Sequence, residues 1–221
     1  MISETKLAEM LCTRLCHDLT GPIGAVNNGA EFLDEEGFDM QNEAVKLILS
    51  SAHEAVHRLQ FYRLAYGRVN DSGEACLADK KQIAADFFSG TKITLDWPDS
   101  HTDASGISIS VKMARLILNL LLIAGNSLIK GGTVSVRLTA TEAEKQIVIT
   151  ANGDVMKLDP ETVRILQGQG DDSMLSPKSS QPFLTVKLAE EVGGNLAIEA
   201  KSDHLEITVR QRQVLLASRA Q

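Results

Sequence analysis

The sequence has little of what marks a disulfide-rich, membrane-spanning or secreted protein. It contains three cysteines in 221 residues, an odd and sparse set that argues against a disulfide framework. The apolar stretch at residues 116–123 is much shorter than the roughly 20 residues that cross a bilayer. The N-terminus has no basic region followed by an apolar one, so we expect no signal peptide and a cytoplasmic location.

Basic residues are also fewer than acidic ones. The chain has 22 lysines and arginines against 29 acidic residues, a net charge of −7. This balance offers no electrostatic footprint for nucleic acid or for an anionic membrane, so we expect neither as a partner. A content of 43% hydrophobic and 23% charged residues suits one or two folded domains with a real core.

A metal site is not predicted either. Cys12 and Cys16 lie four residues apart on a predicted helix, next to His17. A structural zinc site needs about four ligands, and no second cluster of cysteine and histidine accompanies these residues. Reduced cysteines on a helix are the simpler interpretation.

Two long helices are predicted at the start of the chain. Apolar residues recur with helical spacing over residues 3–34, which Ser3 can cap, and with heptad spacing over residues 41–67. A short connection containing Gly37 makes the pair a helical hairpin. One hairpin cannot bury the apolar stripes of both helices, so two copies are expected to form a dimeric four-helix bundle through residues 1–70.

A second domain is predicted at residues 71–221. Residues 70–73 read NDSG, which is turn chemistry and indicates a domain boundary. Helices set against consecutive antiparallel strands predict an α+β sandwich for this part. The helices are expected at 80–88, 112–129, 160–166 and 183–192, and the strands at 92–97, 133–141, 145–151, 195–200 and 204–210.

His17 is the candidate reactive residue. At about 100° per residue it falls opposite the leucines of the first helix, on the polar side. Gly21 and Gly24 each cost about 1 kcal/mol relative to alanine inside a helix, and Pro22 removes a backbone donor. A helix that keeps these residues beside an exposed histidine indicates close approach by a partner. The predicted docking patch consists of the helical neighbours Thr13, Arg14, Gly21, Gly24 and Asn28.

The chemistry available to such a histidine is phosphoryl transfer. A neutral imidazole is a good nucleophile near pH 7 and can hold a phosphoryl group as a phosphoramidate. Asp18 can orient the imidazole of His17 or accept its proton. Arg14, one turn earlier, can pair with phosphate or with a partner's carboxylate. His17 and Asp18 are therefore the predicted catalytic pair.

These residues resemble a known motif. Residues 17–23 read HDLTGPI and are similar to the H-box of sensor histidine kinases. In that family the histidine is the phosphoacceptor on a dimeric helical hairpin, and an ATP-binding α/β sandwich follows. This chain has the same order of parts, and the resemblance covers nearly all of it.

The second domain resembles the kinase ATPase module but departs from it where nucleotide binds. The family's magnesium-binding asparagine falls at Ile123, which has no oxygen to offer. Its adenine-recognising aspartate falls at Ala151, and a glycine of the first glycine box at Val155. Pro182 and Phe183 stand in the second glycine box, where backbone N–H groups would cradle phosphate. The resemblance therefore implies a degenerate ATPase domain without a nucleotide cofactor.

A kinase-like dimer with a degenerate ATPase domain is similar to the ChpT-type histidine phosphotransferases. In those phosphorelays, the receiver domain of a hybrid histidine kinase donates phosphoryl to the histidine. The histidine passes it to the receiver domain of a response regulator, such as the CtrA type. This resemblance implies no cofactor on the chain itself, because Mg²⁺ is expected on the partner receiver domain. Two alternatives are an autophosphorylating kinase with divergent ATP boxes and a non-enzymatic dimeric adaptor that sequesters response regulators.

Overall fold

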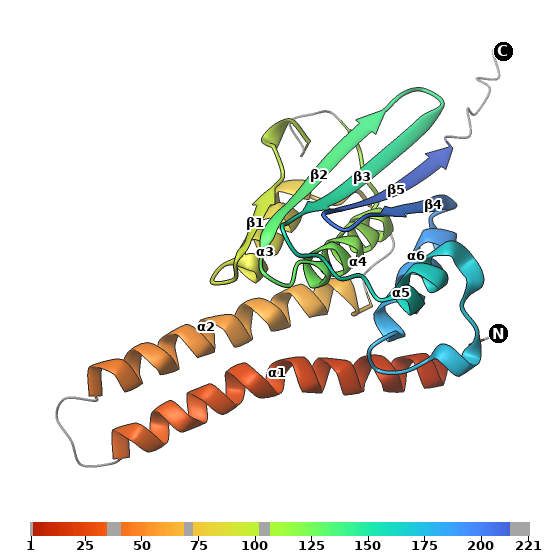
Figure 1. Ribbon diagram of the computed structural model, residues 1–221. Coiled ribbons are helices and arrows are strands. Elements are labelled where there is room, and N and C mark those ends of the chain that lie inside the picture. Colours follow the sequence, from red (N-terminus) through yellow and green to blue (C-terminus); the bar gives the residue numbers. More distant parts are fainter. Residues whose placement is uncertain (1, 35–40, 69–72, 102–106, 213–221) are drawn as a thin grey trace.

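The computed structural model describes residues 2–34, 41–68, 73–101 and 107–212 (Figure 1). Helices α1 (Glu4–Asp34) and α2 (Gln41–Ala65) run side by side as a hairpin, and a sheet with its own helices follows. The predicted hairpin followed by an α+β sandwich is confirmed. The connection at Gly37 and the boundary residues 70–72 lie outside the described residues.

The sheet has five strands in the order β1-β2-β3-β5-β4. Strand β1 is parallel to β2, and the other neighbouring pairs are antiparallel. In register, Val136 of β2 lies opposite Ile149 of β3, which lies opposite Ile207 of β5. All three are buried, so one face of the sheet forms a continuous apolar surface. The strands are β1 (Ile93–Asp96), β2 (Gly132–Ala140), β3 (Glu144–Asn152), β4 (Gly194–Ala200) and β5 (His204–Arg212).

Helices α3, α4 and α6 cover that face and separate it from the hairpin (Figure 1). Helix α4 has neighbours on both sides, which explains its apolar character all round. Ser110 caps α4 by accepting a hydrogen bond of 3.2 Å from the N–H of Met113. The α-helices that follow the hairpin within the described residues are α3 (Leu77–Phe88), α4 (Val111–Ser127), α5 (Pro160–Arg164) and α6 (Ser180–Glu191).

The predicted elements occur in the predicted order, with shifts at their ends. Helix α3 begins at Leu77, three residues before the expected start. The helix expected over 160–166 ends as α5 at Arg164 and continues as the π-helical turn Ile165–Gln169. Gly168 breaks that turn with a φ of +76°, a conformation that glycine adopts at no steric cost.

The hairpin packs on the second domain at one end only. Leu7 near the start of α1 is buried in a small cluster with Ile165 and Phe183. Phe61 and Tyr62 near the end of α2 belong to the main core. Several large apolar side chains of the hairpin lie exposed: Ile23, Phe32, Leu33, Val45, Leu49, Val56 and Leu59.

Candidate functional site

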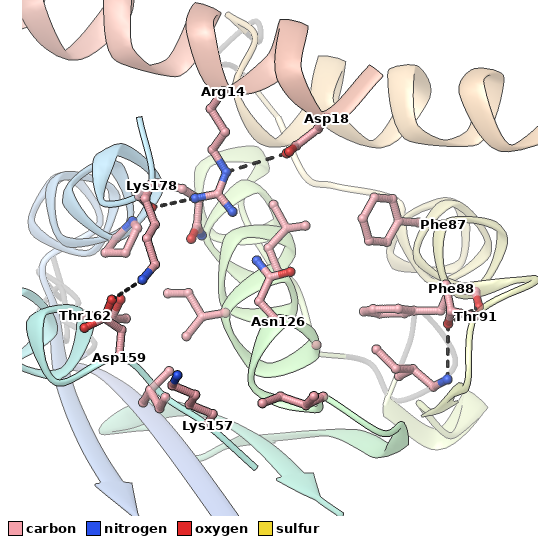
Figure 2. Close-up of a pocket in the computed structure, with 18 of the residues that line it drawn as sticks. Arg14, Asp18, Phe87, Phe88, Thr91, Asn126, Lys157, Asp159, Thr162 and Lys178 are labelled. Carbon is pink, nitrogen blue, oxygen red and sulfur yellow. Dashed lines mark hydrogen bonds and ion pairs between the residues drawn. The ribbon is translucent and has the colours of Figure 1, made fainter. Parts of the chain in front are cut away.

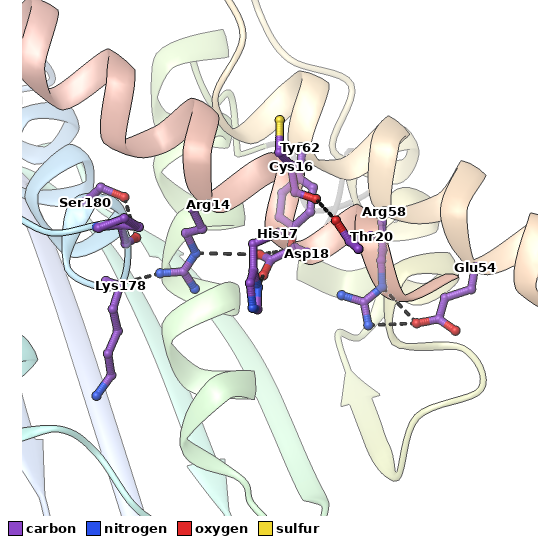
Figure 3. A network of polar contacts seen from close by, with 11 residues as sticks. Arg14, Cys16, His17, Asp18, Thr20, Glu54, Arg58, Tyr62, Lys178 and Ser180 are labelled. Atoms are coloured by element: carbon purple, nitrogen blue, oxygen red, sulfur yellow. Dashed lines mark hydrogen bonds and ion pairs between the residues drawn. The ribbon is translucent and has the colours of Figure 1, made fainter. Parts of the chain in front are cut away.

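His17 projects from α1 into solvent, as the helical wheel predicts. Its side chain is 87% exposed. Ring nitrogen Nδ1 lies 3.3 Å from Oδ1 of Asp18, the next residue (Figure 3). An ionised carboxylate can only accept hydrogen bonds, so a hydrogen bond in this contact is donated by the tautomer that carries its proton on Nδ1. The lone pair of Nε2 is then free to act as a nucleophile.

Asp18 is held from the protein side. Its other oxygen, Oδ2, accepts a hydrogen bond of 2.9 Å from the hydroxyl of Tyr62 on α2. Nε of Arg14 lies 3.7 Å from the same oxygen. One oxygen of Asp18 therefore faces the interior, while the other faces the imidazole (Figure 3).

The structure divides the predicted docking patch. Thr13 and Asn28 are exposed, and a Cβ added at Gly21 or Gly24 would meet no atom within 4 Å. Arg14 differs, because its side chain is only 16% exposed and its Nη1 donates 2.7 Å to the backbone oxygen of Lys178. The other four residues offer a surface of small and polar groups, whereas Arg14 turns toward the second domain.

A cleft of about 730 Å³ lies between the hairpin and helices α4 and α6 (Figure 2). Arg14 and Asp18 line it on the hairpin side, and Phe88 and Ile123 supply apolar wall. Lys178 at its edge makes an ion pair with Asp159 (Figure 2). The hydrogen bond from this ammonium group, followed by one from the Glu161 N–H, lowers the pKa of Asp159.

A second, shallower groove of about 360 Å³ runs beside His17. Gly21 and Pro22 line it from α1, and Glu54 and Arg58 from α2. Nε of Arg58 donates a hydrogen bond of 2.9 Å to Oε1 of Glu54. Because Asp18 lines both hollows, the part of α1 around His17 and Asp18 forms the ridge between them.

Polar and apolar side chains of α4 and its neighbours pack the interior where α2, α4, α6 and the sheet meet. The amide of Asn119 in α4 is buried and donates 2.8 Å to the backbone oxygen of Ala65, at the end of α2. Gln181 donates 2.7 Å to the backbone oxygen of Asn119. Ile123 and Ala151 are buried apolar residues of the core. These side chains join α2, α4, α6 and the sheet.

Sequence reasoning missed three polar residues of the site: Tyr62, Arg58 and Lys178. Tyr62 fits the apolar heptad of α2, so only its hydroxyl indicated another role. Arg58 sits four residues after Glu54, the spacing of a helical ion pair. Lys178 lies 164 residues from its contact Arg14, and no local pattern could have joined the two.

Further properties follow from the described ranges. Cys12, Cys16 and Cys76 are exposed, and none of them forms a disulfide within these ranges. Within residues 2–34, 41–68, 73–101 and 107–212, no three histidine, cysteine or acidic side chains gather as they would around a metal ion. The helices of those same ranges include none with both the length and the apolarity to span a bilayer.

Comparison with known proteins identifies the family. The family model for the histidine phosphotransferase C-terminal domain matches residues 77–204. The protein phosphotransferase ChpT of Brucella abortus (strain 2308) is 33% identical over 205 residues, which cover 92% of this chain and 95% of that protein. A bacterial phosphotransferase structure at 1.7 Å is 31% identical and superposes with a TM-score of 0.81 over 95% of this chain and 98% of its own. The histidine kinase domain of the Erythrobacter litoralis EL346 blue-light activated kinase is more distant, with 13% identity and a TM-score of 0.48 over 88% and 95% of the two chains. The chain therefore belongs to the histidine phosphotransferase family, together with ChpT.

Proposed function

We propose that this protein is a dimeric phosphorelay intermediate whose phosphoacceptor is His17. It accepts phosphoryl from a receiver-domain aspartate of a hybrid histidine kinase and passes it to the receiver aspartate of a response regulator of the CtrA type. The observation that carries the proposal is the imidazole itself, which is 87% exposed with Nδ1 beside a carboxylate. That arrangement leaves Nε2 open to an incoming phosphoryl group.

The proposed reaction is an in-line transfer in which Asp18 assists. The Nε2 lone pair attacks phosphorus, the bond from phosphorus to the donor aspartate's oxygen breaks, and its electron pair stays on that carboxylate. The imidazole of His17 becomes cationic as the N–P bond forms and keeps its proton on Nδ1. The Asp18 carboxylate stabilises this charge. Transfer to the second receiver reverses these steps.

The proposed donor is an aspartyl phosphate and not ATP. Ile123, Ala151 and Pro182 occupy positions where the resembling kinases bind Mg²⁺, adenine and phosphate. In this proposal the receiver domain brings the Mg²⁺, and the chain supplies the nucleophile and a docking surface. Positioning and charge neutralisation carry most of the catalysis of phosphoryl transfer, so a chain without a metal site of its own can take part.

The proposed docking surface is the open side of α1 around His17. Gly21 and Gly24 allow a partner's backbone to come close, and Thr13 and Asn28 offer polar groups at either end. The neighbouring cleft and groove give a receiver domain concave surface on both sides of the ridge. Residues 71–221, the proposed ATPase-like domain, extend this surface without taking part in catalysis.

The dimer is proposed to form through residues 1–70. The apolar side chains that the single hairpin leaves exposed include Leu49, Val56 and Leu59 on α2. Val56 and Leu59 are three residues apart and so lie on one face of the helix. A second hairpin can bury them by completing a four-helix bundle.

A labelled-phosphate assay tests the proposal. A receiver domain of a hybrid kinase, phosphorylated with ³²P, is mixed with the wild-type protein, His17→Ala and the control His53→Ala. His53 is an exposed histidine of α2. We expect label on the wild type and on His53→Ala but not on His17→Ala. Acceptance of label by His17→Ala would refute the role of His17.

Two further measurements separate the alternatives. Isothermal titration with Mg-ATP should give no binding heat, whereas micromolar affinity would favour an autophosphorylating kinase. A non-enzymatic adaptor predicts that receiver binding persists while phosphoryl never reaches the wild-type protein.

A further inference from the structure

We infer that Tyr62 is a positioning residue for phosphotransfer: through Asp18 it holds the His17 imidazole in the tautomer that leaves Nε2 as the nucleophile. The inference rests on the proposed function of His17 and adds a residue to it. Tyr62 comes from α2 and lies 44 residues from Asp18 along the chain. It does not touch the reacting atoms and acts through the carboxylate between them (Figure 3).

The contact between Asp18 and His17 needs outside support. Side chains at adjacent positions of a helix do not face one another, so helical geometry does not bring this pair together. The imidazole is almost fully exposed, and its contact with Asp18 measures 3.3 Å. An exposed pair of this kind gains little on its own and loses side-chain entropy when it is fixed. Something must hold the carboxylate in one rotamer.

Tyr62 supplies the short, directional contact to that carboxylate. Its hydroxyl donates to Oδ2 of Asp18 at 2.9 Å. A hydrogen bond to an ionised acceptor is stronger than one between neutral groups. Arg14 adds charge nearby, but its Nε lies 3.7 Å from the same oxygen, beyond hydrogen-bonding distance. With Oδ2 of Asp18 fixed by Tyr62, Oδ1 of Asp18 is left to accept a hydrogen bond from the imidazole of His17.

Tyr62 is itself immobilised by packing. The residue is 4% exposed and belongs to the main core. Its ring stacks on Tyr66 at 5.2 Å and meets Phe87 edge-on at 5.9 Å. Burial, and then the charge of Asp18, raise the pKa of the Tyr62 hydroxyl. The hydroxyl therefore stays protonated and remains a donor across the physiological range.

The chain of contacts decides which nitrogen reacts. Tyr62 fixes Asp18, Asp18 accepts from Nδ1 of His17, and the lone pair is left on Nε2. When the N–P bond forms, the positive charge that develops on the ring lies beside a carboxylate already in place. Without the Tyr62 hydroxyl, Asp18 can rotate away and both imidazole tautomers become populated.

The chain offers a matched pair of variants. Tyr62→Phe removes one oxygen and keeps the ring contacts. Tyr66→Phe removes a hydroxyl from the next turn of the same region, and this hydroxyl is buried with no hydrogen-bond partner among the described residues. Both variants delete one tyrosine hydroxyl, but only Tyr62→Phe deletes a contact to Asp18.

Two readouts need no partner protein. Long-range ¹H–¹⁵N spectra report the tautomer of His17, and ³¹P spectra follow its chemical phosphorylation by phosphoramidate, which releases ammonia as Nε2 takes the phosphoryl group. We expect the wild type and Tyr66→Phe to show the Nδ1–H tautomer and to react at Nε2. We expect Tyr62→Phe to show mixed tautomers and to react about tenfold more slowly.

A double variant shows whether Tyr62 works through Asp18. Asp18→Ala should shift the tautomers in the same way as Tyr62→Phe, and adding Tyr62→Phe to Asp18→Ala should produce no further slowing. The inference is overturned if Tyr62→Phe keeps the wild-type tautomer and rate, if Tyr66→Phe has an equal effect, or if the wild type reacts at Nδ1. The tautomer is read without any transfer, so it stands apart from the ³²P assay on which the proposed function depends.

Discussion

Helices α4 and α1 differ in how much of their apolar surface is buried. Helix α4 has 17 residues, and 13 of them are buried between the sheet and the hairpin. Helix α1 has 31 residues, and its buried residues are Leu7, Pro22 and Gly29. Most of the buried core therefore lies in the sheet and its helices, to which α2 adds Phe61 and Tyr62, whereas the hairpin leaves large apolar side chains and His17 exposed. Stability should reside mainly in the second domain, and recognition and chemistry in the hairpin.

The largest effect on activity is expected at His17. Replacing it with alanine should lower phosphoryl acceptance at least about 1,000-fold, because no other group takes its place on phosphorus. The side chain is 87% exposed, so the melting temperature should stay within about 1 °C of wild type. Calorimetry beside the ³²P assay measures both quantities. A large fall in melting temperature would contradict the division between the hairpin and the second domain.

A core residue should show the reverse behaviour. Leu120 in α4 is fully buried, so Leu120→Ala should lower the free energy of unfolding by about 2–5 kcal/mol. The transfer rate of the folded protein should change little. Urea unfolding followed by circular dichroism gives the difference. Ile129→Ala, at an exposed apolar position just after α4, is the control and should cost less than about 0.5 kcal/mol. A cost below 1 kcal/mol at Leu120 would count against the assigned core.

The role of the exposed apolar side chains of the hairpin in dimer formation can be tested by introducing one charged residue among them. Leu59→Glu should raise the dissociation constant of the proposed dimer about 100-fold or more, because a two-fold interface contains the change twice. Light scattering after size exclusion measures the mass. Ile129→Glu is a matched control, since Ile129 is 58% exposed and Leu59 is 53% exposed. A monomeric wild type, or equal dissociation in both variants, would argue against a dimer through the hairpin.

The smallest effect is expected at the ion pair of Asp159 and Lys178. Asp159→Asn should lower the melting temperature by about 1–2 °C at pH 7, since surface ion pairs contribute little. The pKa of Asp159 is lowered in the folded protein. Its stabilising contribution is therefore complete above the ordinary aspartate pKa of about 3.9 and is lost as pH falls through the folded value. The difference between variant and wild type should shrink in melts at pH 3, and an undiminished difference would exclude this origin.

Much of the fold could be read from the sequence because its signals are local. Helical spacing, strand alternation and the turn chemistry around residues 70–73 gave the order of elements, and the wheel placed His17 in solvent. Contacts between distant segments were beyond such reasoning. A helical wheel gives the direction of the Cβ of Arg14, but the guanidinium group of this long side chain reaches the backbone oxygen of Lys178. The heptad of α2 explains the burial of Tyr62 but says nothing about the partner of its hydroxyl.

The exposed stripe marks another limit of local patterns. Leu33, Val45 and Leu59 fit the apolar periodicity of their helices, yet the single chain leaves them exposed. Periodicity reports that a side chain is to be buried, but not whether its own chain or another molecule covers it. The cleft could not be predicted from local patterns either, because it forms between the hairpin and helices α4 and α6.

The docking of the first turns of α1 also has a consequence for biosynthesis. Leu7 packs on Ile165 and Phe183, and Arg14 bonds to the backbone of Lys178. A ribosome that adds about 5–20 residues per second needs roughly 8–30 s to make the intervening chain. During that interval the emerging hairpin has no docking site on its own polypeptide, although a neighbouring nascent hairpin could already pair with it. In the proposed dimer, the hairpins of two copies can therefore pair before either chain is complete.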